Sequence, residues 1–222
     1  MTRHSGLSVF LGVLLALSLG IGVLAGTLWF FGTDAGLLER WLQWDAAPAS
    51  AGLTEADHAP VARLIADTMA GRQTVFQYRD LFSEQAWVHM LDCAPLFALA
   101  RTVGLTGFGL FFAALIGSCF LRSPRGTAVG MLVGVGVLLA AALILGVWGL
   151  IDFDGLFTAF HRVAFRNDLW LFPASDLLIR LMPLPFFVRY AAAGGGLWLA
   201  CLLATAAVAG LLLKYNGKKI RS

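Results

Sequence analysis

Charged residues are scarce in this chain. They make up 13% of its 222 residues, whereas hydrophobic residues make up 59%. A soluble globule needs many more polar side chains to cover its exterior. The composition therefore excludes a soluble globular protein and predicts an integral membrane protein.

Cysteines are also few, and the common catalytic motifs are missing. Cys93, Cys119 and Cys201 show no paired spacing, so neither a disulfide framework nor a zinc site is expected. The chain has no Gly-x-Ser-x-Gly turn, no His-Glu-x-x-His helix and no phosphate-binding glycine loop. We therefore expect neither a metal nor a cofactor.

The small positive charge comes from basic residues that flank apolar runs. These residues are Arg3, Arg122, Arg125, Lys214, Lys218, Lys219 and Arg221. Basic residues mark the cytoplasmic side of membrane proteins, so both termini and the loop at residues 122–125 are expected in the cytoplasm. The net charge of +3 then reflects topology and contact with membrane phospholipid, and no nucleic-acid partner is expected.

Four apolar runs dominate the sequence. They lie at about residues 7–31, 103–121, 128–151 and 187–213. Each can cross a hydrocarbon core of roughly 30 Å as a helix. The predicted fold is an all-α, single membrane domain over residues 1–222, a bundle of four transmembrane helices. Glycines within the runs, such as Gly107, Gly109 and Gly130, are typical of close helix packing.

Two segments lie outside the cytoplasm in this topology, at about residues 32–101 and 152–185, and they form a mostly helical cap. Thr54 and Asp57 resemble a capping box, which predicts an amphipathic helix over about residues 55–70. His58 in that helix is expected to face solvent. The run Gln73–Arg79 mixes β-branched and aromatic residues and is interpreted as a short strand.

The first of these segments also carries a candidate site. Ser83 and Glu84 indicate a further helix start, and the helix is expected to continue into the second apolar run. His89 and Asp92 are three residues apart on it, so they share one face.

The second segment contains another histidine between carboxylates. If residues 154–170 are helical, Asp154, His161 and Asp168 are seven residues apart and lie nearly on one line along the helix. Basic and aromatic side chains beside them suit the lipid headgroup layer and an amphiphilic substrate. These side chains are Arg162, Arg166 and Trp170.

Two histidines on one membrane face can catalyse acyl transfer. One neutral imidazole takes a proton from the attacking group while the other donates a hydrogen bond to the carbonyl oxygen. Asp92 or Asp168 could hold one ring in a single tautomer. The competing interpretations are that the histidines are ordinary interfacial polar residues, or that His89, Asp92 and His161 bind a metal, although their spacing matches no metal motif.

Three blocks of the chain together resemble one family. They are Leu81–Phe82–Ser83–Glu84 leading to His89–Met90–Leu91–Asp92, Phe160–His161 leading to Phe165–Arg166–Asn167–Asp168–Leu169–Trp170, and Pro173–Ala174–Ser175–Asp176–Leu177–Leu178–Ile179. On these residues the chain is similar to the bacterial lipoprotein intramolecular transacylases, called Lit, which are four-span membrane proteins.

The resemblance implies a specific reaction. The sn-2 acyl chain of the diacylglyceryl group on a lipoprotein's N-terminal cysteine moves to that cysteine's α-amino group, without a cofactor or a second lipid donor. His161 would be the base and His89 would polarise the ester carbonyl. Asp92, Asn167 and Asp168 would support them. The site would face outward from the bacterial cytoplasmic membrane, where mature diacylated lipoproteins present their lipids.

Other functions remain open from the sequence. A non-catalytic scaffold or chaperone could bind lipids or lipoproteins with the same outer surface. A hydrolase could release the acyl chain to water. A transporter is less compatible with the sequence, because the apolar runs hold almost no ionisable residues and show no clear inverted repeat.

Overall fold

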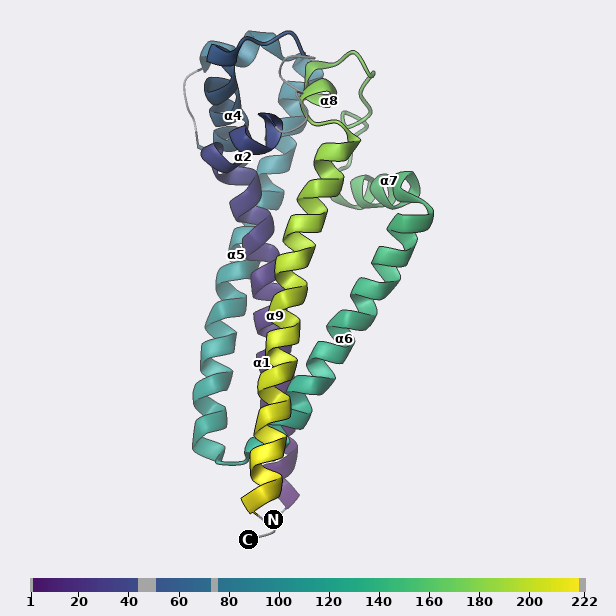
Figure 1. Ribbon diagram of the computed structural model, residues 1–222. Helices are drawn as coiled ribbons and strands as arrows, with labels where there is room; N and C mark the ends of the chain where they lie inside the picture. Colours follow the sequence, from purple (N-terminus) through teal and green to yellow (C-terminus); the bar gives the residue numbers. More distant parts are fainter. Residues whose placement is uncertain (1, 44–50, 73–75, 220–222) are drawn as a thin grey trace. The chain divides into compact units, whose positions relative to one another are not determined.

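The computed structural model describes residues 2–43, 51–72 and 76–219 (Figure 1). Every secondary-structure element in these ranges is helical, which confirms the predicted all-α class. The four long helices are α1 (Thr2–Thr33), α5 (Glu84–Leu121), α6 (Pro124–Ile151) and α9 (Leu184–Lys219). All four are long and apolar enough to cross a membrane, and they contain the four predicted spans.

Helix α5 is longer than a membrane crossing requires. Its 38 residues extend to about 57 Å at roughly 1.5 Å per residue, whereas the hydrocarbon core is about 30 Å thick. The sequence prediction that one helix begins at Glu84 and continues into the second span is therefore confirmed. The extra length gives this helix a polar first part, which carries His89.

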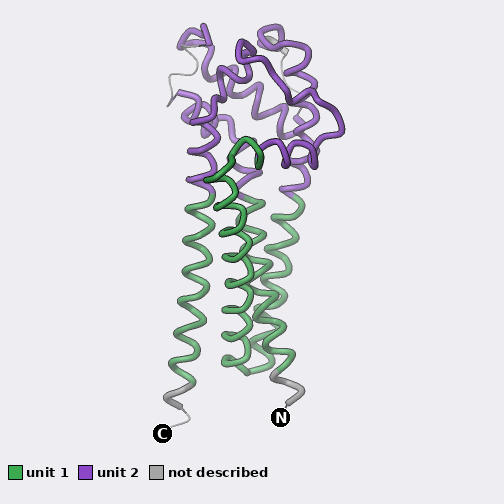
Figure 2. Tube along the Cα trace, turned by 90° about the vertical axis from the view of Figure 1, so that its right-hand side faces the viewer, with its two compact units in different colours: residues 1–26, 102–156, 195–222 green, residues 27–101, 157–194 purple. Residues whose placement is uncertain are grey.

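The chain divides into two compact units (Figure 2). Unit 1 comprises Met1–Gly26, Thr102–Leu156 and Gly195–Ser222, so it holds the four apolar helices. Small residues let the helix backbones approach closely there. A Cβ added to Gly107 would lie 2.8 Å from the Gly22 Cα, and one added to Gly130 would lie 2.0 Å from the Val9 carbonyl oxygen. The packing role predicted for these two glycines is confirmed, but Gly109 borders open space.

Unit 2 comprises Thr27–Arg101 and Phe157–Gly194. Its shorter elements are α2 (Ala35–Gln43), α4 (Glu55–Met69), the 3₁₀ helix η1 (Phe76–Leu81), most of α7 (Phe153–Ala164) and α8 (Leu177–Leu181). Apolar faces of α2, α4, α5 and α8 form its core. That core includes Leu38, Leu42, Val61, Ile65, Phe82, Met90 and Leu181. Burial of such a shared apolar surface is what holds these short helices in place.

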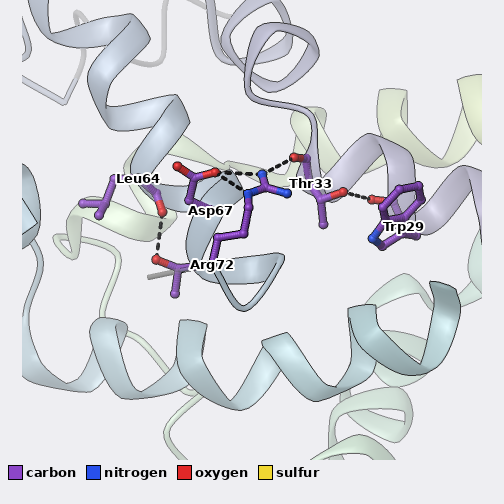
Figure 3. Close-up of polar contacts among 6 residues, drawn as sticks. Trp29, Thr33, Leu64, Asp67 and Arg72 are labelled. Atoms are coloured by element: carbon purple, nitrogen blue, oxygen red, sulfur yellow. Dashed lines mark hydrogen bonds and ion pairs between the residues drawn. The ribbon is translucent and has the colours of Figure 1, made fainter. Parts of the chain in front are cut away.

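Helix α4 begins and ends as the sequence predicts, with defined polar contacts at both ends. The backbone N–H and hydroxyl of Thr54 donate to Asp57 Oδ2 at 2.9 and 2.6 Å, and these bonds lower the pKa of that carboxyl. At the other end, Arg72 pairs with Asp67 at 2.7 Å and donates to the Thr33 carbonyl oxygen at 3.0 Å (Figure 3). The end of α4 is thus fixed to the end of α1.

The strand predicted over Gln73–Arg79 is not found. Residues 73–75 lie outside the described part, and Phe76–Leu81 form η1 instead. A lone strand would leave its N–H and C=O groups without a neighbouring strand, whereas a 3₁₀ turn satisfies them locally. Arg79 then forms an ion pair with Glu84 and lies over the Trp87 ring, so η1 is held against the start of α5.

Candidate active site

His89 is buried on the first part of α5, with only 8% of its surface exposed. Helix α5 begins at Glu84 because the Ser83 hydroxyl accepts a hydrogen bond from the Ala86 N–H at 3.1 Å. One turn after His89, the Cys93 sulfur lies 3.7 Å from its Nε2. The thiol S–H can donate to the unprotonated ring nitrogen. With this donation, the ring proton of neutral His89 is on Nδ1.

That Nδ1 atom is buried and has no hydrogen-bond partner among the residues that the structure describes. Buried polar atoms without a partner are rare in folded proteins, and each calls for an explanation such as a functional role. In His89, the N–H that points to no protein group is available to a substrate oxygen.

His161 is the one buried residue of α7, and its tautomer is set by the backbone. Its Nδ1 lies 2.7 Å from the Phe157 carbonyl oxygen, one helical turn earlier. A carbonyl can only accept, so Nδ1 carries the proton and Nε2 carries a free lone pair. The sequence suggested a carboxylate as the partner, but the partner is this backbone carbonyl. With Nδ1 protonated, Nε2 is the ring nitrogen that can accept a proton.

The two rings lie close together inside unit 2. Their centroids are 6.2 Å apart and their planes are inclined by 27°. At this separation one bound molecule can contact both rings. His89 and His161 were predicted as a pair from separate segments, and the structure brings them together.

Aromatic side chains enclose the pair. Phe165 and Phe172 lie 4.8 and 5.4 Å from the His89 ring, and Trp170 lies 4.9 Å from the His161 ring. Burial lowers the pKa of His161 below its ordinary value, and the hydrogen bond to the Phe157 carbonyl opposes this shift. His161 is thus neutral at pH 7, as a proton acceptor must be.

Asp92 and Asn167 join α5 to the loop after α7. The Asn167 side-chain amide donates to Asp92 Oδ2 at 2.8 Å, and its carbonyl oxygen accepts from the Leu169 N–H at 3.1 Å. The Asn167 backbone carbonyl accepts from Trp170 Nε1 at 3.0 Å. These two predicted residues therefore hold the indole that contacts His161.

The predicted helix through residue 170 ends early, because α7 stops at Ala164. Asn167 bonds to the backbone two residues later, a local turn that competes with helix formation. Asp168 consequently leaves the face of His161 and is exposed, as are Arg162 and Arg166. In the described part of the chain no hydrogen bond or ion pair joins these three side chains to the histidine pair, although the sequence placed them beside it.

Several contacts of the site were not predicted. Gln85 lies one turn before His89 and donates to the loop that carries Trp170, and the sequence signal for it was its i−4 spacing from His89. Phe157 and Phe172, whose rings contact the histidine rings, were not predicted as site residues. His58, expected in solvent, instead has both ring nitrogens buried. No cluster of three metal-binding side chains is found within the described ranges.

Four membrane-crossing helices and a buried histidine pair with one free lone pair and one free N–H define a multi-pass membrane protein equipped for acid–base chemistry. Residues 9–187 match the sequence family described as lipoprotein intramolecular transacylase Lit. The chain belongs to this family and is an acyltransferase.

Solved structures agree with the fold. The membrane-integral lipoprotein intramolecular transacylase Lit from Bacillus cereus is 16% identical, with a TM-score of 0.73 over 97% of this chain and 98% of that chain. Two further structures of that protein, with one histidine replaced by arginine or by alanine, are each 17% identical with TM-scores of 0.71 over 97% of this chain. They cover 94% and 96% of those chains. Among curated proteins the comparison found no match.

Proposed function

We propose that this acyltransferase moves the sn-2 acyl chain of a diacylglyceryl-cysteine lipoprotein to the α-amino group of the same cysteine. The product is an N-acyl lyso-form lipoprotein. The observation that carries the proposal is the complementary state of the two buried rings: Nε2 of His161 has a free lone pair, and the buried Nδ1 of His89 has no hydrogen-bond partner among the described residues. Acyl transfer to an amine needs one group of each kind.

In the proposed reaction His161 is the base. Its Nε2 takes a proton from the α-amino nitrogen, whose lone pair attacks the ester carbonyl carbon. The C–N bond forms and the carbonyl π electrons move to oxygen. When the C–O bond to glycerol breaks, the leaving sn-2 oxygen receives the proton from His161, so the ring returns to its neutral state. A positioned base of this kind contributes about 10²- to 10⁴-fold in rate.

His89 stabilises the negative charge on the carbonyl oxygen. Its Nδ1–H is fixed by the Cys93 contact at Nε2 and lies among Phe165 and Phe172. Hydrogen bonds to a developing charge are stronger in such a dry setting than in water. Because donor and acceptor rings are 6.2 Å apart, one ester group can meet both.

The neighbouring residues would support the reaction. Asp92 and Asn167 hold the loop, and Trp170 covers His161. Arg162 and Arg166 are exposed and would contact phospholipid or lipoprotein groups at the membrane surface, as would Asp168 through its carboxylate. We further propose that both termini are cytoplasmic and that the site faces the extracytoplasmic side of the cytoplasmic membrane. The flanking basic residues support that orientation.

The test is mass spectrometry of the N-terminal lipopeptide of one host lipoprotein, with the protein absent, present, or carrying His161→Ala. His58→Ala, a histidine of α4 outside the pair, is the matched control. With the wild-type protein, the expected result is an unchanged number of acyl chains with one relocated from glycerol to the amine. His58→Ala should keep this relocation, and His161→Ala should abolish it. A lipopeptide that loses one chain indicates a hydrolase. A lipopeptide that is identical in all samples overturns the transfer and favours a lipid-binding scaffold.

A further inference from the structure

Gln85 of α5 binds the backbone of the loop that covers His161 on both sides of Trp170. Its amide nitrogen lies 3.1 Å from the Leu169 carbonyl oxygen and 2.9 Å from the Leu171 carbonyl oxygen. A side-chain amide has two N–H donors, so each carbonyl receives one. The two carbonyls are those of the residues immediately before and after Trp170.

Trp170 depends on this support because the loop has no regular secondary structure. Backbone carbonyls in such a loop need a partner from elsewhere in the fold or from water. With both flanking carbonyls fixed by Gln85 and the indole N–H fixed by Asn167, the Trp170 side chain is 8% exposed and packs 4.9 Å from the His161 ring.

The placement of Gln85 on α5 connects this support to the other histidine. Gln85, His89 and Asp92 are spaced four and three residues apart, so they lie on one face of the helix. His89 contributes its ring to the pair, while Gln85 and Asp92 bind the loop whose tryptophan covers His161. One face of α5 therefore carries His89 and also holds the loop that lies against His161.

We propose that Gln85 is a positioning residue for acyl transfer, because it keeps the Trp170 indole against the His161 ring. This inference rests on the proposed role of His161. Loss of the two hydrogen bonds frees the loop, the indole moves away, and water reaches the imidazole. The His161 ring is then less well oriented and less well shielded from water.

Shielding from water has a measurable signature. Burial is what lowers the pKa of His161, so a hydrated ring should titrate closer to its ordinary value of about 6.5. The groups that can add charge are His89 and Asp92 from α5, Arg162 from α7 and Asp168 from the loop. None of them is altered by a substitution at Gln85, so a change in the acid side of the rate profile reports hydration of the ring.

The experiment measures kcat and KM of the full-length protein in detergent micelles against a synthetic diacylated lipopeptide, across pH. Gln85→Leu keeps the size and removes the donors. The matched control is Gln43→Leu, which removes an exposed glutamine bonded to Glu39 on α2. Gln85→Leu should lower kcat about 10- to 100-fold, as a small misplacement of reacting groups does, with little change in KM. Its acid limb should move to higher pH.

A double-mutant cycle with Trp170→Ala separates positioning from a general loss of structure. If Gln85 acts through Trp170, the double variant should lose no more rate than Trp170→Ala alone. An unchanged kcat, a fall in kcat with an unmoved acid limb, or fully additive losses would each overturn the role of Gln85. If Gln85→Leu unfolds, Gln85→Met, which is unbranched and uncharged and has no donor, takes its place with the same expectations. Full activity of His161→Ala would instead reject the proposed function.

Discussion

The two units of this protein differ in what their long-range hydrogen bonds join. In unit 1 the hydroxyls of buried serines and threonines mostly donate within their own helices, and long-range bonds from Ser8 and from Trp198 join α1 to the start of α6 and to α9. In unit 2, Gln85 and Asn167 bond to residues 75 to 86 positions away. A group satisfied within its own helix cannot fix another element, whereas a long-range bond can.

This contrast separates the helix packing of unit 1 from the arrangement of the histidine pair in unit 2. Unit 1 packs by steric fit between glycines and facing backbones, which stabilises the helix packing. Unit 2 holds a histidine pair in one arrangement through bonds between separate segments. Substitutions in unit 1 should therefore change stability, and substitutions around the pair should change the rate.

The strongest test of the contrast is removal of the two histidines singly and together. His89→Ala should lower the rate about 10²- to 10³-fold, as loss of a donor to a developing oxyanion does. Because residues that act as a unit are not additive, His89→Ala with His161→Ala should be little slower than the slower single variant. Single-turnover transfer on a synthetic diacylated lipopeptide measures this. Losses that multiply would show that the rings work independently.

In unit 1, enlarging a glycine should affect unfolding without affecting chemistry. A Cβ at Gly130 would collide with the Val9 carbonyl, so Gly130→Ala should lower the free energy of unfolding by about 1–3 kcal/mol. The control is Gly136→Ala on the same helix, where no atom lies within 4 Å. Thermal unfolding in detergent provides the measurement, and kcat of the folded fraction should stay at the wild-type value. A large fall in kcat would remove the distinction between the units.

The same contrast explains how much of the molecule was predictable. The spans and the start of α5 follow from local features, namely apolar runs, basic flanks and the Ser83 cap. The pairing of His89 with His161 followed from the predicted topology and from the resemblance to a known family, because 72 residues separate them and no local rule joins them.

The remaining details of the site depend on tertiary structure. The end of α7 is decided by the turn at Asn167, which competes with an otherwise helical pattern. The partner of His161 is a backbone carbonyl, and every helical residue offers one, so no side-chain pattern marks it. Gln85 also binds backbone carbonyls, which no sequence pattern distinguishes from one another.

A smaller effect is expected from Cys93, whose thiol contacts His89 without joining the reaction. Cys93→Ala removes the group that keeps the proton on Nδ1, so part of the population adopts the other tautomer and the rate should fall about 3- to 10-fold, as loss of one neutral hydrogen bond implies. Cys93→Ser retains a donor and should recover most of the rate. Nitrogen-15 chemical shifts of His89 check the tautomer directly, and an unchanged spectrum in Cys93→Ala would contradict the assignment.

The smallest effect should appear in the pH dependence of stability. The folded protein holds His161 with a lowered pKa, whereas the unfolded chain titrates near 6.5. Between those values the unfolded state binds more protons, so this histidine makes the free energy of unfolding decrease as the pH falls below about 6.5. His161→Phe should lose less stability between pH 7.5 and pH 5 than the wild type, measured by thermal unfolding in detergent. Gly130→Ala, which alters only unit 1, should keep the wild-type dependence on pH. An equal decline in the wild type and His161→Phe would mean that folding does not lower the pKa of this histidine, and would contradict the burial of its ring as the cause of the shift.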